Sequence, residues 1–197
     1  ADIDAVLPVV INAIVQNAGQ TCSAGSRLLV EQSLYEPLLE RLGEAFTRLR
    51  VGPAAMDLDL GPLIRQTQQQ RVWDFLSDAQ HAGISVMAQG QVIDEAPQSG
   101  YYQAPTLLRD VPITHRLAQE EVFGPVLSAM SFRSEDHAVE QVAGRPGRDD
   151  GVGDEALDVQ FLRRIAVACD DDLAVDEGRG LRGVDREYGR LARIDRV

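Results

Sequence analysis

The chain has 197 residues, a formal net charge of -12, and 44% hydrophobic residues. This length and apolar content fit a globular protein of one domain or slightly more. The acidic balance argues against a nucleic-acid partner, because no basic patch offsets phosphate repulsion. No apolar run approaches the roughly 20 residues of a membrane span, and the first residues lack the basic start of a signal peptide. We therefore expect a cytoplasmic protein with no membrane partner.

Apolar spacing predicts helices and strands in alternation along the chain. Helices are expected over about 4–16, from Ser33 to near Gly52, over about 67–80 and after a Ser134 cap; strands or extended segments are expected over 26–32, 84–90, 101–111 and 125–132. Ser33 and Glu36 have the spacing of a capping box, and Pro105 favours a sheet edge or a strand start. The apolar residues expected on the inward faces of the first two helices are Val6, Val9, Val10, Ala13 and Ile14, and Leu38, Leu39, Leu42, Phe46 and Leu49. The alternation predicts an α/β fold with a mostly parallel sheet.

Residues 141–197 differ from the rest in composition. They contain no Ser, Thr, Asn, His, Met, Trp or Lys, whereas Arg, Asp, Gly and Val dominate. The chain also lacks lysine throughout, which suggests a GC-rich gene. We interpret the segment as the product of a shifted reading frame, with a charged, weakly ordered tail as the alternative. The predicted division is a domain over 1–140 and an anomalous tail over 141–197.

The segment "NAGQTCSAG" (17–25) holds Cys22, one of two cysteines in the chain. A free thiol near neutral pH is only a few per cent thiolate, so a catalytic cysteine needs a nearby cation, helix N-terminus or backbone amides. Gly19 permits a tight turn in which backbone N–H groups converge on Cys22 and, with an amide side chain, stabilise an oxyanion. Taken alone, the segment favours the interpretation of Cys22 as a buried small hydrophobe. Neither Cys22 nor Cys169 has metal-type spacing to the three histidines, so no metal site is expected.

Around this cysteine, "VQNAGQTCSAGS" (15–26) resembles the active-site signature of the aldehyde dehydrogenase superfamily. Further segments resemble family landmarks in the same order: "ADIDAV" (1–6), "LDLGPLI" (58–64), "GYYQAPTLL" (100–108) and "QEEVFGPVLSAMSF" (119–132). The resemblance covers residues 1–140. It implies a partial aldehyde dehydrogenase catalytic domain with a mostly parallel sheet.

The resemblance also implies roles for three residues. Cys22 matches the nucleophile that attacks an aldehyde to form a thiohemiacetal, from which a hydride passes to NAD or NADP to give a carboxylic acid or thioester. Glu121 matches the glutamate that binds the nicotinamide ribose, and Phe123 the aromatic residue beside the nicotinamide. A carboxylate that accepts both ribose hydroxyls would fix the ring at its reacting distance. Outside this motif, Glu121 would be interpreted as half of a solvated pair with Glu120.

Other polar and aromatic residues carry weaker signals. Gln68 is a candidate cofactor contact, with an ordinary surface glutamine as the alternative. His115 could be paired with Cys22 in a cysteine hydrolase, although "SAG" after Cys22 is not typical of that class. His81 is expected to be exposed, and His137 to lie on a short polar helix. Trp73 and Phe75 are expected to be helix-packing residues and not a stacking platform, with Phe75 on the buried face.

Several parts of the family's sequence pattern that flank these landmarks are not recognisable in this chain. The dinucleotide-binding half and the general base are expected upstream of residue 1, and the oligomerisation strand of this usually homo-oligomeric family is not recognisable. We therefore expect a fragment of an enzyme that acts on a small-molecule aldehyde; the fragment by itself can be inactive. The alternative is a non-catalytic aldehyde dehydrogenase-like protein that acts through a partner.

Overall fold

The computed structural model describes residues 2–134, 137, 138, 141 and 165–168. Helices and strands alternate, as the apolar spacing predicts. The elements in chain order are α1 (Ile3–Val15), η1 (Gln16–Gly19), β1 (Arg27–Glu31), α2 (Gln32–Arg48), β2 (Arg50–Val51), η2 (Ala54–Met56), α3 (Gln66–His81), β3 (Val86–Gln89), β4 (Gln91–Val92), β5 (Thr106–Leu108), α4 (Arg116–Gln119), β6 (Val126–Phe132) and β7 (Ile165–Ala168).

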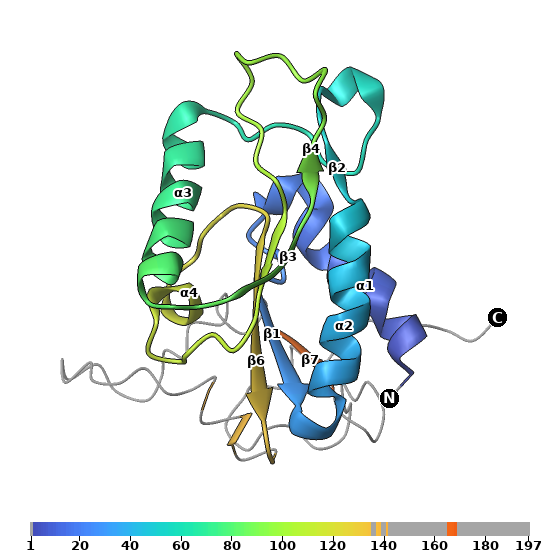
Figure 1. Cartoon of the computed structure of the whole chain (residues 1–197), viewed down its shortest axis with the longest axis vertical. Coiled ribbons are helices and arrows are strands. Elements are labelled where there is room, and N and C mark those ends of the chain that lie inside the picture. Colours follow the sequence, from blue (N-terminus) through green and yellow to red (C-terminus); the bar gives the residue numbers. More distant parts are fainter. Residues whose placement is uncertain (1, 135–136, 139–140, 142–164, 169–197) are drawn as a thin grey trace.

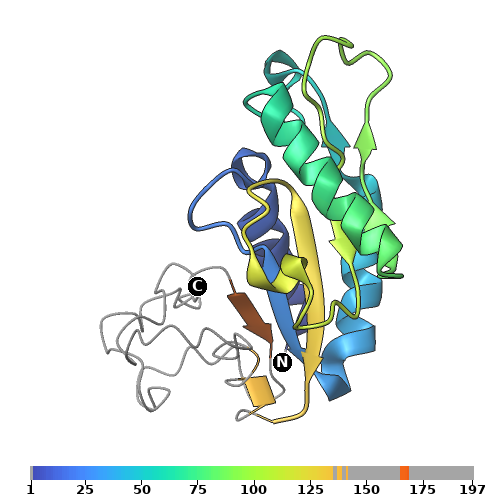
Figure 2. The same cartoon turned by 90° about the vertical axis from the view of Figure 1, so that its left-hand side faces the viewer.

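A five-stranded sheet forms the centre of the molecule, in the order β3-β5-β6-β1-β7. Strand β1 is parallel to β6 and β7, and β5 is parallel to β6, whereas β3 is antiparallel to β5. The prediction of a mostly parallel sheet is therefore confirmed. Helices α1 and α2 lie on one side of the sheet, and α3 and α4 lie on the other (Figures 1 and 2). Strands β2 and β4 form a separate parallel pair.

The core lies between the sheet and both helical layers. Burial of the central strands on both faces explains their continuous apolar sequences. All five apolar positions predicted to face inward on α2 are buried: Leu38, Leu39, Leu42, Phe46 and Leu49. On α1, Val6, Val10 and Ile14 are buried, but the prediction for Val9 is wrong, because 39% of its surface is exposed.

The start of α2 differs from the predicted capping box. The helix begins at Gln32, one residue before Ser33, and no side chain caps its N-terminus. Glu36 instead forms an ion pair with Arg109, whose Nη2 lies 2.6 Å from its Oε1. The guanidinium offers the carboxylate a charged partner, so Glu36 does not turn back to the helix end.

Two other local predictions are settled by the structure. Pro105 directly precedes β5, a strand with neighbours on both sides, so it marks a strand start rather than an edge. The Ser134 cap is present, since its Oγ accepts a hydrogen bond from the His137 N–H at 3.3 Å.

Within the predicted tail, Ile165–Ala168 forms β7 alongside β1. The frame-shift interpretation concerns residues that otherwise lie outside the described part of the chain, so it stays a prediction. No helix among the described residues is long and apolar enough to cross a lipid bilayer.

Candidate active site

Several of the segments singled out in the sequence meet at one end of the sheet. The Cys22 segment precedes β1, the Tyr101–Tyr102 segment precedes β5, and Glu121–Pro125 precedes β6. Because these three strands run parallel, the segments before them lie at the same end of the sheet. Ligands in open α/β sheets more often bind at the opposite, carboxyl end of the strands.

The turn before Cys22 is wound in the left-handed backbone region. Asn17, Ala18 and Gly19 have φ values of 51°, 52° and 70°. The Asn17 Nδ2 donates to the Gln20 carbonyl at 3.0 Å, and the Gln20 N–H donates to the Asn17 carbonyl at 3.1 Å. The predicted tight turn at Gly19 is therefore confirmed, and these two hydrogen bonds come from within the turn itself.

This turn presents Cys22 to solvent. The thiol side chain is exposed, so the interpretation of Cys22 as buried filler is wrong. Among the described residues, no backbone carbonyl accepts from the Cys22 N–H. The neighbouring Thr21 Oγ1 is buried and has no hydrogen-bond partner in the same part of the chain. The turn thus offers a thiol and a backbone donor beside a hydroxyl with unused hydrogen-bonding capacity.

Two glycines bring the Cys22 turn against the segment before β6 (Figure 2). A Cβ atom placed on Gly19 would lie 2.2 Å from the Gly124 carbonyl oxygen, far inside van der Waals contact. A Cβ on Gly124 would lie 2.5 Å from Val72 Cγ2 of α3. The two turns and α3 therefore stack at a spacing that only glycines permit.

Glu121 and Phe123 come directly before Gly124 in the chain, and both are half-buried. Phe123 adopts φ of 58°, a left-handed conformation that costs a non-glycine residue about 1–3 kcal/mol. The Gln68 Nε2 donates to the carbonyls of Val122 and Phe123 at 3.0 and 2.8 Å. The alternative of Gln68 as an ordinary surface glutamine is wrong, because its amide binds this turn.

Sequence reasoning missed two side chains that hold these turns. The Arg71 Nη2 donates to the Glu121 carbonyl at 2.5 Å. The Gln20 Oε1 accepts from the Ile64 N–H at 2.9 Å, which ties the Cys22 turn to the segment that leads into α3. For Arg71, a cation on the same helical face as Gln68 was an available signal. For Gln20, no local pattern pointed to residue 64.

The histidines do not join this site. His115 caps α4, where its Nδ1 accepts from the Leu117 N–H at 3.2 Å, and it shares no hydrogen bond with Cys22. His81 is exposed at the end of α3. The His137 Nδ1 accepts from the Arg133 N–H. Within the described residues, no group of three or more His, Cys, Asp or Glu side chains could hold a metal ion.

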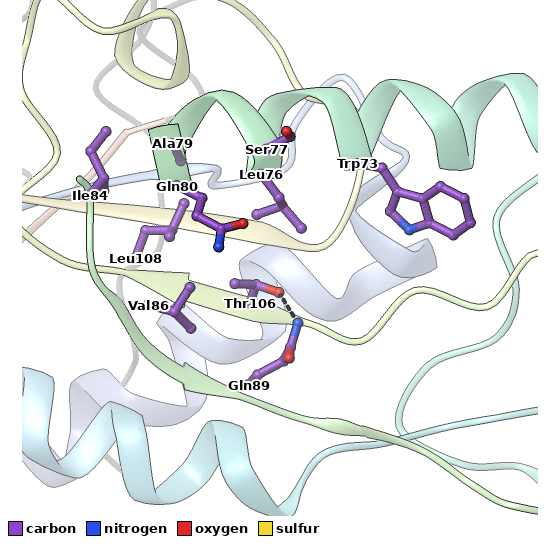
Figure 3. A pocket seen from close by; sticks show the side chains of 10 residues that line it. All are labelled: Trp73, Leu76, Ser77, Ala79, Gln80, Ile84, Val86, Gln89, Thr106 and Leu108. Atoms are coloured by element: carbon purple, nitrogen blue, oxygen red, sulfur yellow. Dashed lines mark hydrogen bonds between the residues drawn. The ribbon is translucent and has the colours of Figure 1, made fainter. Parts of the chain in front are cut away.

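The two aromatic residues of α3 differ from each other. Phe75 is fully buried, as expected, but the prediction for Trp73 is wrong, since 48% of its surface is exposed. Trp73 lines a groove of about 580 Å³ between α3 and strands β3 and β5 (Figure 3). This groove contains none of Cys22, Glu121 and Phe123, so it is separate from the candidate site.

Comparison with known proteins shows the family to which the chain belongs. The family model described as "Aldehyde dehydrogenase family" matches residues 1–145. The chain belongs to the aldehyde dehydrogenase family. Among curated relatives, an aldehyde dehydrogenase of Didymella fabae is 35% identical over 156 residues, which cover 77% of this chain and 32% of the relative.

Solved structures of aldehyde dehydrogenases have the same fold. A crystallised candidate aldehyde dehydrogenase from Burkholderia cenocepacia has a TM-score of 0.71 and 70% identity, covering 72% of this chain and 30% of that one. An NAD+ complex of an aldehyde dehydrogenase from Bacillus cereus has a TM-score of 0.65 and 31% identity, covering 72% and 28%. The chain thus spans about a third of the length of its aldehyde dehydrogenase relatives.

Proposed function

We propose that this protein is an oxidoreductase of the aldehyde dehydrogenase type. It oxidises an aldehyde to a carboxylic acid or thioester with NAD or NADP, through a thiohemiacetal on Cys22. The observation that carries the proposal is the Gly19–Gly124 contact, which joins the exposed cysteine turn to the turn of Glu121 and Phe123. Nucleophile and cofactor residues must be neighbours for this reaction, and this contact connects their two segments.

The Cys22 turn supports addition of the thiol to a carbonyl group. The Cys22 Sγ attacks the carbonyl carbon, a C–S bond forms, and the thiol proton ends on the former carbonyl oxygen. Negative charge develops on that oxygen during the attack, and a backbone donor lowers the barrier by stabilising it. No backbone carbonyl of the described residues accepts a hydrogen bond from the Cys22 N–H. We assign to this N–H the role of the stabilising donor.

The Glu121–Phe123 turn fits a nicotinamide nucleotide. Glu121 is a half-buried carboxylate, which can accept from both hydroxyls of a ribose, and Phe123 offers a half-buried ring for packing. The strained φ of Phe123 supports a binding role, because such strain gathers at ligand sites. The bound dinucleotide supplies the hydride acceptor. The residues Glu121 and Phe123 would hold its nicotinamide ribose and ring.

The partner in this proposal is a small aldehyde, and the compartment is the cytoplasm. An exposed free thiol suits a reducing compartment, where it stays available for reaction.

The test is production of NADH or NADPH from a panel of aliphatic and aromatic aldehydes. We compare the wild-type chain with Cys22→Ala and with Ser23→Ala, a neighbouring exposed residue that serves as the matched control. Nucleophilic catalysis predicts that Cys22→Ala abolishes turnover, while Ser23→Ala retains it within about twofold.

Turnover that survives Cys22→Ala would refute the proposed nucleophile. Ester cleavage by Cys22 without any nicotinamide would favour a cysteine hydrolase instead. Loss of turnover in the wild type, with an intact fold and a co-purified aldehyde dehydrogenase, would favour the non-catalytic alternative.

A further inference from the structure

Strand β3 lies at the edge of the five-stranded sheet, so one side of its backbone has no neighbouring strand within the described part of the chain. Its other side pairs with β5. An edge strand leaves a row of N–H and C=O groups that can pair with another strand. Proteins usually protect such an edge with charged side chains, proline, a bulge, a short length or a covering element.

Strand β3 has only some of these protections. It is four residues long, and its register against β5 shifts between Val86 and Ala88, as in a bulge. However, residues 82–93 contain no Asp, Glu, Lys, Arg or Pro, in a chain of which 25% of the residues are charged. The edge is therefore short and bent, but it carries no charge that would repel an approaching strand.

The two faces of β3 are covered unequally. On one face α2 packs closely, since a Cβ atom placed on Gly43 would lie 3.6 Å from Met87 Cε and 3.7 Å from Ala88 Cβ. On the other face lies the groove between α3 and strands β3 and β5 (Figure 3). Trp73 of α3 and Val86 of β3 line this groove, and 48% and 56% of their surfaces are exposed. A large apolar surface therefore stays in solvent beside the open edge.

No charged residue lines this groove. Its polar side chains are Ser77, Gln80, Gln89 and Thr106, and the Gln89 Nε2 already donates to the Thr106 Oγ1 at 3.0 Å. Because each chain carries a net charge of -12, two copies repel each other in most orientations. An uncharged apolar groove beside an unpaired strand is a face where this repulsion is weak and where burial of apolar surface is favourable.

We propose that the β3 edge binds the β3 edge of a second copy of this chain. The two strands run antiparallel about a two-fold axis, so that unpaired N–H groups of one strand donate to carbonyls of the other. Trp73 and Val86 of both copies become buried beside the paired strands, and tryptophan is a residue type that often dominates such interfaces. Because both copies use the same surface, the contact closes at a dimer. This proposal goes beyond the proposed function and does not depend on it.

Two exposed valines supply matched variants. Val86→Glu places a carboxylate on the β3 edge, and the two-fold axis brings two such carboxylates to the same interface. Val9→Glu makes the same change on α1, where 39% of the Val9 surface is exposed and no contact with β3 is proposed. Gln89→Glu is a second variant on β3, which adds the charge while it keeps the shape of the side chain.

Analytical ultracentrifugation of the full chain over a range of concentrations measures the dissociation constant of the dimer. Val86→Glu should raise this constant at least about tenfold, because like charges that meet in an interface are unfavourable, whereas Val9→Glu should leave it within about twofold. Raising the salt concentration from about 0.1 to 0.5 M should tighten the wild-type dimer, since salt screens the repulsion between the acidic chains. Amide hydrogen exchange at residues 86–89 should slow as the protein concentration rises.

Three results would overturn the proposal. A wild-type chain that stays monomeric has no such dimer, and binding of an extended apolar peptide to that monomer would assign the edge to another protein. Equal dissociation constants for Val86→Glu and Val9→Glu would place the interface elsewhere. A mass that rises beyond that of a dimer would contradict a closed two-fold contact. If Val86→Glu lowers the thermal midpoint, Gln89→Glu gives the comparison with Val9→Glu.

Discussion

The two turns that form the candidate site are held in opposite ways. The Cys22 turn is wound by its own residues, through Gly19 and reciprocal hydrogen bonds between Asn17 and Gln20. The Glu121–Phe123 turn is held from outside, by Gln68 and Arg71 of α3. A locally determined turn should tolerate changes elsewhere in the fold, whereas an externally held turn should loosen whenever its supporting helix does.

Phe75→Ala should have the largest effect and should separate the two turns. Truncating a fully buried phenylalanine costs about 3–5 kcal/mol and here also removes the surface on which Arg71 and Arg116 lie. Amide exchange should rise more at residues 121–124 than at 17–22. An equal rise in both turns would contradict the proposed difference. Trp73→Ala, a change to an exposed aromatic on the same helix, is the control.

Gly19→Ala should act directly on the Cys22 turn. The added Cβ would lie 2.2 Å from the Gly124 oxygen, and the residue sits at φ of 70°, so we expect a loss of about 2–4 kcal/mol. Urea unfolding measures the loss of unfolding free energy, and the rate of Cys22 alkylation reports a change in the conformation of the turn. Gly61→Ala, where no atom lies within 4 Å of the new Cβ, should be nearly neutral. A neutral Gly19→Ala would show that the two turns do not touch.

Tyr35 gives a pH test outside both turns. Burial raises the pKa of Tyr35 to about 12, and its hydroxyl accepts from the Asp110 N–H at 2.8 Å. Because this pKa lies above the unfolded value near 10, the stabilisation is complete below pH 10 and is lost as pH rises through 12.

The wild type should therefore lose about 1.4 kcal/mol by pH 11 relative to Tyr35→Phe, which cannot titrate. Denaturant unfolding at pH 8 and 11 measures this difference. The relative exchange of the two turns should not change with pH over this range. Identical pH profiles for the two proteins would contradict the shift in pKa.

Gln20→Met should have the smallest effect. It removes the 2.9 Å bond from the Ile64 N–H and should cost about 1 kcal/mol. The Cys22 turn keeps its Asn17 bonds, so alkylation of Cys22 should change by less than about threefold. A collapse of the turn in this variant would show that it, too, depends on outside support. Gln70→Met, on the exposed face of α3, is the control.

The same contrast explains what the sequence could predict. Helix and strand alternation, the buried face of α2 and the turn at Gly19 follow from local spacing and from glycine itself. The left-handed Phe123 could not be predicted, because an aromatic residue gives no local sign of it and the groups that hold it come from α3.

Tertiary partners also overrode two local patterns. Glu36 forms an ion pair with the guanidinium of Arg109 instead of the predicted capping box. Gln68 binds the turn before β6, whereas Gln70 bonds to Asp74 within its own helix. Because both lie in a run of glutamines from 68 to 70, the sequence alone does not distinguish them. The resemblance to a family supplied the roles of Cys22, Glu121 and Phe123, which remain proposals.

The central claim is that the Cys22 thiol adds to an aldehyde. The most direct measurement is the 13C NMR spectrum of the chain with an aldehyde labelled at its carbonyl carbon, which needs neither cofactor nor turnover. We predict a protein-bound thiohemiacetal resonance in the wild type and in Ser23→Ala that is absent in Cys22→Ala. A spectrum of free aldehyde and hydrate alone, or an adduct that persists in Cys22→Ala, would contradict the account.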